Sequence, residues 1–409
     1  MNKPNFLFVS IDGMTDPLGS AQVLPYLINL SKKGFNIGIV SCEKKENFEP
    51  QHQQIKSLID NANITWDYCF YKSGKPFFSQ WQNYNALKKI AFSELKKQPN
   101  TILHCRSYLS ALIGLHAKKK NGTRFIFDMR GFWADERIEG NIWKKSNPIE
   151  AYLYSYFKKK ETQLLQHADA IVSLTEKAKV IILNWKINNV VAKKITVIPC
   201  CADLQHFSTA NLNIEKLQAL KNNLPQLQNK FVLSYIGSLG TWYMAKEMLD
   251  FFKCLDTKTP AIFLIITKDD KEIIFELAQK IGIPKEKLVI VSAHRSEMPY
   301  YITLSMASLF FIKPTFSKSA SSPTKLGELL SMGVPVVTNA GIGDVDAVIL
   351  KSHCGVLISE FLDAHYQNAT TDLLTNIDAY KNNTIDTANR YFSLQHGVEK
   401  YAEIYDSLL

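Results

Sequence analysis

A Lys- and Ser-rich turn at residues 313–325 holds the side chains best suited to bind an anion. Its cations are Lys313, Lys318 and Lys325, and its hydroxyl residues include Ser321, Ser322 and Thr324. An apolar run precedes the turn and a helical pattern follows it, which predicts a strand, a turn and a helix capped by Ser321 or Ser322, with Pro323 near its first position. Because N–H groups and the helix dipole attract negative charge at a helix N-terminus, we expect phosphate to bind here.

Glu328 follows Thr324 and Lys325 by about one helical turn. At that spacing the three side chains can share one face of the helix, so the Glu328 carboxylate can accept hydrogen bonds from hydroxyl groups of the same ligand. Gly333 and Pro335 end the predicted helix. The alternative is a polar surface loop before an ordinary core strand, with no ligand at all.

A second group of candidate side chains follows predicted strands in the N-terminal half. His104 and Arg106 end one apolar run, and Asp128 and Arg130 follow another. Because ligands bind at the carboxyl ends of parallel strands, these residues are candidates to position an acceptor or a phosphate. For His104 we favour a buried, hydrogen-bonded packing role over catalysis, and Asp128 and Arg130 could equally form an internal ion pair.

Positioning such groups requires strands whose carboxyl ends lie side by side. Short apolar runs alternate with amphipathic helical runs along the chain, which predicts an α/β fold with parallel sheets. The loop 12–20, with Gly19 and Ser20, follows the first run at 5–11 and should line a ligand cleft. It lacks a G-x-G-x-x-G pattern, which argues against a dinucleotide-dependent oxidoreductase.

A second strand and helix series begins at residues 231–241, where the loop after the strand contains Gly237 and Ser238. The second half therefore repeats the architecture of the first. We expect an N-terminal domain at 1–205, a C-terminal domain at 206–385 and a C-terminal helix at 386–409 that packs back on the first domain. The polar stretch 208–230 is the predicted crossing between domains.

Length and composition indicate a soluble globular protein. The 409 residues suggest two or three domains, and the mean hydropathy is −0.10. No apolar run approaches the ~20 residues that span a bilayer. Seven scattered cysteines without a C-x-x-C pair favour a reducing cytoplasm and no structural zinc.

Positive charge is concentrated in the N-terminal half. Residues 1–200 contain 29 Lys and Arg against 16 Asp and Glu, whereas the remaining residues contain 19 against 22. This asymmetry suggests an anionic partner such as lipid headgroups, nucleic acid or a charged substrate. Lysines on solvated helix faces would produce the same asymmetry without a partner.

Aromatic residues are dense between residues 66 and 84, where eight rings are interleaved with lysines. Such a surface could lie at a membrane interface or stack on sugars or bases. We nevertheless expect at least half of these rings to belong to the core. The run 149–168 predicts an amphipathic helix with Lys158, Lys159 and Lys160 on its polar face.

Five segments, in order along nearly the whole chain, resemble the retaining glycosyltransferases of family 4, which have the GT-B fold. They are Asp16-Pro17-Leu18-Gly19-Ser20, residues 168–175, residues 197–207, residues 234–239, and Glu328 with Met332-Gly333-Val334-Pro335-Val336-Val337. The resemblance implies two Rossmann-like βα domains facing across a cleft. The first would bind the acceptor and the second the nucleotide sugar.

Two departures from the family pattern concern the donor. Glu328 matches the second of two glutamates that lie eight residues apart in the family, which contacts the ribose of the nucleotide. Ala320 stands where the first glutamate is expected, and Ser238 and Thr241 stand where basic residues usually follow the glycine loop. The run 321–325 could replace the missing glutamate, and Lys313, Lys318 or Lys325 could supply the missing charge.

The resemblance implies a metal-independent, hexosyltransferase-like enzyme that needs no cofactor beyond its nucleoside-diphosphate-sugar donor. Its catalytic candidates are Lys325, Lys318, Arg106, Asp128 and Arg130, and its donor-binding candidates are Gly19, Ser20, Gly237, Ser238, Lys313, Ser321, Ser322, Thr324 and Glu328. The expected acceptor is a saccharide or polyprenyl-linked molecule in surface polysaccharide or glycolipid synthesis. We expect a cytoplasmic protein, peripheral on the inner face of an anionic membrane and not bound to nucleic acid. The alternatives are a sugar-nucleotide epimerase or hydrolase, and a non-catalytic carbohydrate or nucleic-acid binder.

Overall fold

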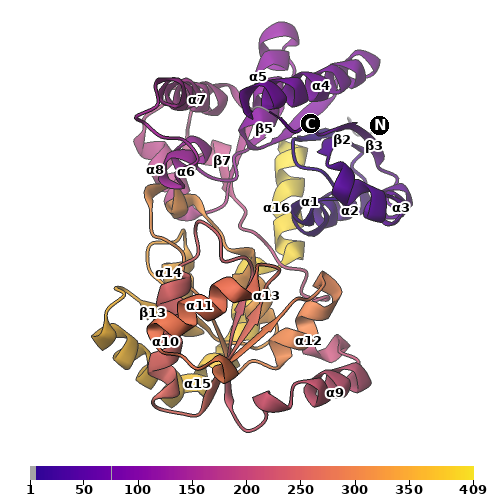
Figure 1. The fold of residues 1–409 in the computed structure, drawn as a ribbon. Helices are drawn as coiled ribbons and strands as arrows, with labels where there is room; N and C mark the ends of the chain where they lie inside the picture. Colours follow the sequence, from indigo (N-terminus) through magenta and orange to yellow (C-terminus); the bar gives the residue numbers. More distant parts are fainter. Residues whose placement is uncertain (1–5, 75) are drawn as a thin grey trace. The chain divides into compact units, whose positions relative to one another are not determined.

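A computed structural model describes residues 6–74 and 76–409, without the side chains of residues 76 and 77. The chain forms two compact units (Figure 1). The first unit comprises residues up to Pro199 together with Leu394–Leu409, and the second comprises Cys200–Ser393. Each unit contains one parallel sheet with helices on its faces.

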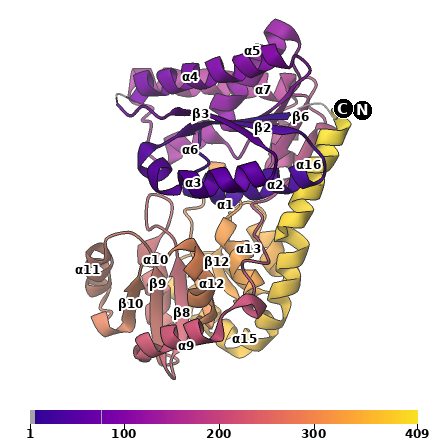
Figure 2. The same cartoon turned by 90° about the vertical axis from the view of Figure 1, so that its right-hand side faces the viewer.

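The first unit has a seven-stranded sheet in the order β3-β2-β1-β4-β5-β6-β7. Its strands are β1 (Phe6–Ser10), β2 (Ile37–Glu43), β3 (Thr65–Phe70), β4 (Ile102–Arg106), β5 (Phe125–Asp128), β6 (Ala170–Ser173) and β7 (Ile195–Val197). Its helices are α1 (Pro17–Gln22), α2 (Leu24–Lys32), α3 (Lys45–Asn61), α4 (Pro76–Lys97), α5 (Ser107–Asn121), α6 (Trp133–Glu139), α7 (Pro148–His167), α8 (Glu176–Asn184) and α16 (Leu394–Ser407). Figure 2 shows α4 and α5 on one face of this sheet and α1, α2 and α3 on the other.

The C-terminal helix α16 completes the core of the first unit. The ring of Tyr405 is fully buried and stacks on Phe6 of β1, with 3.8 Å between ring centroids. Tyr401 packs edge-on against Tyr26 of α2 at 5.4 Å. Side chains four residues apart lie on one face of a helix, so both tyrosines turn toward the sheet.

The second unit has a six-stranded sheet in the order β10-β9-β8-β11-β12-β13. Its strands are β8 (Phe231–Ile236), β9 (Ala261–Ile266), β10 (Leu288–Val291), β11 (Ala307–Phe310), β12 (Val336–Asn339) and β13 (Gly355–Ile358). Its helices are α9 (Ile214–Asn223), α10 (Ala245–Asp256), α11 (Lys271–Ile281), α12 (Met298–Thr303), α13 (Thr324–Ser331), α14 (Val345–Ser352) and α15 (Asp363–Phe392). Strands buried on both faces read as continuous apolar runs, as in the fully buried β9.

The predicted α/β class with two Rossmann-like units is confirmed. In each sheet the strand order reverses at one point, between β1 and β4 in the first unit and between β8 and β11 in the second. Ligands of open α/β sheets bind at the carboxyl ends of the strands around such a switch point. The candidate sites are therefore described there, one unit at a time.

The chain passes between the units at Pro199 and Cys200 and again at Ser393 and Leu394, a few residues from the predicted boundaries. The second unit begins at Cys200, and nearby the backbone N–H of Ala202 donates a hydrogen bond to the Phe392 carbonyl at the end of α15. The stretch 208–230, expected to connect the domains, lies within the second unit and contains α9.

The expectation that at least half of the aromatic rings of residues 66–84 are core is wrong for the described side chains. Tyr68, Phe70, Phe78 and Trp81 are exposed, and Trp66, Tyr71 and Tyr84 are half-buried. For the β3 rings the reason is that β3 is an edge strand, and the α4 rings Trp81 and Tyr84 line a groove between helices. The side chain of Phe77 and all of Lys75 lie outside the described residues. No helix in the described ranges is long and apolar enough to cross a membrane.

Candidate functional site

Lys325 occupies the switch point of the second sheet. It lies in the first turn of α13, and its Nζ lies 3.9 Å from the ring centroid of Tyr243 and 4.5 Å from that of Tyr235. A Cβ atom added to Gly237, just after β8, would lie 2.9 Å from this Nζ. Gly237 has φ +126°, which favours glycine, so the loop conformation and the lysine both require a glycine there.

The ammonium group of Lys325 is buried without a hydrogen-bond acceptor among the described residues. Burial lowers its pKa to about 7, and the nearby Glu328 carboxylate opposes this shift only partly. The aromatic rings around Nζ favour a cation but provide no acceptor oxygen. An anionic ligand oxygen beside Gly237 would complete the environment of this group.

Glu328 lies on the same helix and forms an ion pair with Arg295. An oxygen of Glu328 lies 2.9 Å from an Nη of Arg295, and the guanidinium of Arg295 lies 5.1 Å from the Phe207 ring. Burial raises the pKa of Glu328, whereas Arg295 lowers it by charge and hydrogen bonding. The sequence analysis missed Arg295, because it lies 33 residues before Glu328 in a short turn without a recognisable motif.

The predicted serine cap of α13 is wrong. The helix begins at Thr324 with Pro323 as its N-cap residue, and no side chain caps it. The Ser322 hydroxyl instead accepts a hydrogen bond from the backbone N–H of Cys200 at 3.1 Å. The backbone N–H of Ser321 bonds to the Lys318 carbonyl, so this serine closes the preceding turn.

The remaining predicted donor residues lie around the same strand ends. The Nζ of Lys318 lies 3.7 Å from the Trp242 ring centroid, and Lys313 is exposed. Ala320 is buried in a 3-10 turn (Phe316–Ala320), so this position cannot present a carboxylate to solvent. The Ser238 carbonyl accepts a hydrogen bond from the Tyr235 hydroxyl, which holds the glycine loop against β8.

In the first unit, Asp128 is the centre of a buried polar cluster. The Tyr401 hydroxyl donates to Asp128 at 3.1 Å, and Arg106 and Arg130 each place an Nη 3.8 Å from its carboxylate. His104 lies 3.7 Å from the same carboxylate. The structure thus brings Arg106, Asp128 and Arg130 together, because β4 and β5 are neighbours.

The positive charges around Asp128 keep its carboxylate ionised despite its burial. Burial alone would raise the pKa of Asp128, but Arg130, a hydrogen bond from His104 and the charge of Arg106 outweigh it and lower the pKa to about 2. His104 is fully buried, and its Nδ1 lies 2.9 Å from the Tyr405 hydroxyl. His104 is therefore a packed, hydrogen-bonded residue of the core, and Asp128 is an ionised acceptor. The sequence analysis expected the C-terminal helix to pack on this domain but gave Tyr401 and Tyr405 no polar role.

A buried glutamate fixes the loop after β1. Glu43 ends β2, and its carboxylate accepts hydrogen bonds from the backbone N–H groups of Met14 and Thr15 and from the Thr15 and Ser41 hydroxyls, at 2.5 to 3.1 Å. A Cβ atom on Gly19 would overlap the carbonyl oxygen of Gly13, so α1 packs directly on this loop. The sequence analysis did not single out Glu43.

Ser20, predicted with Gly19 to bind the donor, directs its hydroxyl to the carbonyls of Asp16 and Pro17. Both residues therefore shape the loop that begins the wall of a polar cavity. This cavity, of about 320 Å³, is lined by Asp12, Asp16, Lys44, Tyr71, Asn83, Ser107, Trp133 and Arg137, together with Ile11, Gln80 and Leu109. Arg106 lies 3.7 Å from Asp12, which connects the Asp128 cluster to this cavity.

Comparison with known proteins agrees with this arrangement. Residues 24–206 match the family model described as Glycosyltransferase Family 4. No curated protein gives a match to the sequence. A glycosyltransferase from Rickettsia africae superposes with a TM-score of 0.72 at 17% identity, covering 100% of this chain and 99% of that protein.

Two further solved structures are similar over the whole chain. Anabaena HepE in complex with UDP and glucose has a TM-score of 0.70 at 13% identity and covers 99% of this chain and 100% of its own. WaaG, a glycosyltransferase involved in lipopolysaccharide biosynthesis, has a TM-score of 0.62 at 14% identity, covering 98% and 99%. The chain thus has the GT-B fold of these glycosyltransferases, and residues 24–206 match the Glycosyltransferase Family 4 model.

Proposed function

We propose that the protein transfers a hexose from a nucleoside-diphosphate sugar to a saccharide or lipid-linked acceptor, with retention of anomeric configuration. The observation that carries this proposal is the buried, acceptor-free ammonium of Lys325 beside Gly237. A diphosphate oxygen is the ligand that such a site requires. HepE, which has a similar fold, has been solved with UDP and with UDP-glucose.

In the proposed reaction, the bond between the anomeric carbon and the diphosphate oxygen breaks. A bond from an acceptor hydroxyl oxygen to the same carbon forms on the same face, and the hydroxyl proton passes to the departing diphosphate. Lys325 and the N–H groups at the start of α13 would stabilise the charge on the leaving oxygen, so the reaction requires no metal ion. Glu328 would accept hydrogen bonds from the ribose hydroxyls.

The acceptor would bind in the polar cavity of the first unit, where Asp12, Asn83 and Arg137 offer both hydrogen-bond donors and acceptors. Arg106, Asp128 and Arg130 would position this wall rather than react. Surface polysaccharide or glycolipid synthesis is the proposed pathway class, supported by the likeness to WaaG and to the lipopolysaccharide outer core galactosyltransferase WaaB.

Release of nucleoside diphosphate from a panel of sugar nucleotides tests the proposal. Lys325→Ala should lower turnover on the order of 10²-fold to 10³-fold, as loss of one charge-stabilising donor does in other enzymes. Lys280→Ala, at an exposed lysine of α11 in the same unit, is the matched control and should change turnover little. The proposal would be refuted if no donor supported turnover and none bound in calorimetry. Donor consumption without a glycosylated acceptor would indicate a hydrolase or epimerase.

We further propose that the basic N-terminal half holds the protein on the inner face of an anionic membrane. The excess of 29 Lys and Arg over 16 Asp and Glu in residues 1–200 supports this contact. The full-length protein should sediment with phosphatidylglycerol vesicles at low salt and be released at high salt, because screening weakens surface attraction. Equal recovery with zwitterionic vesicles would contradict an electrostatic contact.

A further inference from the structure

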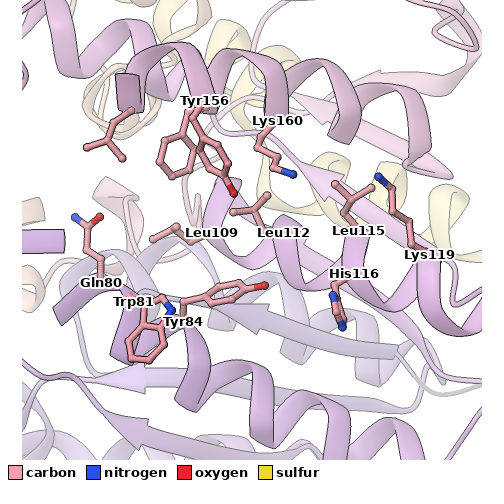
Figure 3. A pocket seen from close by; sticks show the side chains of 12 residues that line it. Gln80, Trp81, Tyr84, Leu109, Leu112, Leu115, His116, Lys119, Tyr156 and Lys160 are labelled. Atoms are coloured by element: carbon pink, nitrogen blue, oxygen red, sulfur yellow. The ribbon is translucent and has the colours of Figure 1, made fainter. Parts of the chain in front are cut away.

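Two cavities of the first unit adjoin one another on the side of the sheet that α4 and α5 cover. One is the polar cavity at the strand ends described above. The other is a groove of about 390 Å³ between α4, α5 and α7, shown in Figure 3. Gln80 and Leu109 line both, so the groove and the polar cavity share part of their walls. Each volume falls within the range of about 300–1,000 Å³ that is usual for ligand sites.

The groove is apolar along its length. Leu109, Leu112 and Leu115 follow one another at helical spacing on α5, and Leu153 and Phe157 lie on α7. Figure 3 shows Tyr156 on one side of these leucines and Trp81 and Tyr84 on the other. Trp81 is 61% exposed, so a large apolar ring borders the groove without covering it.

The charge around the groove is positive. Lys119 and Lys160 lie on its rim beside His116, whose pKa is lowered by burial, and of the described residues that line it none is acidic. Helices α4, α5 and α7 together contain ten lysines and three glutamates. Glu161 is engaged with Tyr108 and Lys158, and Glu94 with Lys97, so neither neutralises the rim. An anionic amphiphile is the ligand class complementary to this surface.

Arg137 provides a cation in the adjoining polar cavity. Its guanidinium lies 4.0 Å from the ring centroid of Trp133 and 5.4 Å from that of Trp143. Its Nε is buried and has no hydrogen-bond acceptor among the described residues. A planar guanidinium held between rings with an unused donor is suited to bind a phosphate oxygen.

We propose that the two cavities together bind one molecule of a lipid-linked acceptor, with its phosphate beside Arg137 and its hydrocarbon chain in the groove between α4, α5 and α7. This inference rests on the proposed transferase function and specifies its acceptor. The polar cavity takes the phosphate and the sugar that it carries. The groove removes the hydrocarbon chain of the ligand from water. This accounts for the position of an apolar groove beside the polar cavity that binds the sugar. The rim lysines then lie where the chain leaves the groove, beside neighbouring anionic lipids.

Farnesyl phosphate, a short isoprenyl monophosphate, tests the two halves of the site together. The full-length protein should bind it at least about tenfold more tightly than it binds either farnesol or inorganic phosphate in calorimetry, because each of these lacks one half of the contacts. Binding should also shift the fluorescence of Trp81 as water leaves the groove. In Trp81→Phe this spectral shift should shrink to the part that Trp133 reports from the polar cavity, while calorimetric binding remains.

Substitutions assign the binding to the groove. Leu112→Glu places a charge on the apolar floor and should weaken farnesyl phosphate binding by about tenfold or more. Leu58→Glu makes the same change at an exposed leucine of α3, outside both cavities, and should leave the affinity unchanged. Arg137→Gln should weaken binding of farnesyl phosphate but not of farnesol. Trp81→Ser, at a mostly exposed site that cannot disturb the core, gives a second test if Leu112→Glu fails to fold.

Unchanged affinity in Leu112→Glu and Trp81→Ser would overturn the proposal. So would binding to phosphatidylglycerol vesicles with no affinity for dispersed farnesyl phosphate, because a basic surface on a bilayer would then explain the groove. Calorimetric binding of UDP to the second unit is measured on the same samples. Intact UDP binding with failed lipid binding overturns this inference alone, whereas loss of UDP binding in the wild type overturns the proposed function.

Discussion

At the scale of single residues, Lys325 combines burial, aromatic contacts and the lack of a hydrogen-bond acceptor among the described residues. Burial of a cation costs free energy because it removes the charge from water, and this lowers the pKa of Lys325 to about 7. Because its Nζ lies beside Gly237, we propose that Lys325 supplies the positive charge that Ser238 and Thr241 do not supply after the glycine loop. The positive charge belongs to a residue of α13, and its side chain extends back over the glycine loop that follows β8.

This pKa gives nucleotide binding a pH dependence with a definite sign. Below pH 7 Lys325 is already protonated and can pair with the diphosphate. Above pH 7 it must take up a proton when nucleotide binds, so UDP affinity should fall with rising pH, by up to about tenfold per pH unit. Calorimetry in buffers of different ionisation enthalpy should detect proton uptake at pH 8.

The arginine variant separates this lysine from other titrating groups. Lys325→Arg stays charged throughout and should make the affinity independent of pH between 7 and 9, whereas Lys280→Arg should behave as wild type. In the protein without nucleotide, the free energy of unfolding should instead rise with pH. Because the unfolded chain holds this proton up to about pH 10 and the folded protein releases it near 7, Lys325 makes folding stability rise with pH over that window. A UDP affinity that is flat in the wild type would disprove the role of Lys325.

Glu328 is held by Arg295 in the structure, and its predicted ribose contact needs one of its oxygens to remain available. Glu328→Gln should weaken UDP binding by about tenfold, the usual loss for one charge-assisted hydrogen bond. Glu286→Gln, at an exposed glutamate in the same unit, is the control. A lower melting temperature with unchanged UDP affinity would mean that Glu328 only anchors Arg295.

At the scale of elements, the loop after β1 depends on a carboxylate from β2. Glu43→Gln keeps the shape but turns an N–H₂ group toward backbone N–H donors, so we expect a loss of about 2 kcal/mol. The amides of Met14 and Thr15 should then exchange hydrogen faster by well over tenfold. Glu46→Gln, at an exposed position of α3, should exchange as wild type.

The elements also show how far the sequence could predict this structure. Arg106, Asp128 and Arg130 were predicted together because each follows a strand and neighbouring parallel strands end at one edge. The serine cap of α13 failed because Ser322 binds the Cys200 backbone, which is 122 residues away in the chain. Tyr401 lies 273 residues from Asp128, and Arg295 has no motif, so neither contact has a local signal. The exposed rings of β3 were misassigned because hydrophobic pattern does not distinguish an edge strand from a central one.

At the scale of the whole molecule, the first unit is built from two distant parts of the chain. Tyr405→Ala removes the ring stacked on Phe6 and should destabilise this unit by about 3–5 kcal/mol, the usual cost of deleting a buried aromatic ring. Urea unfolding followed by tryptophan fluorescence should report an earlier transition, because five of the six tryptophans lie in the first unit. Tyr152→Ala, at a 69% exposed ring, should leave the transition unchanged.

The return of α16 to the first unit has a consequence for synthesis on the ribosome. The second unit is continuous from Cys200 to Ser393 and contains every strand of its own sheet. The first unit, although its strands are translated earliest, lacks the rings of Tyr401 and Tyr405 until the final segment has left the exit tunnel. The first unit is therefore translated first but completed after the second unit, which reverses the usual N-terminal-first order of folding. During elongation the apolar surface of β1 is exposed to chaperones.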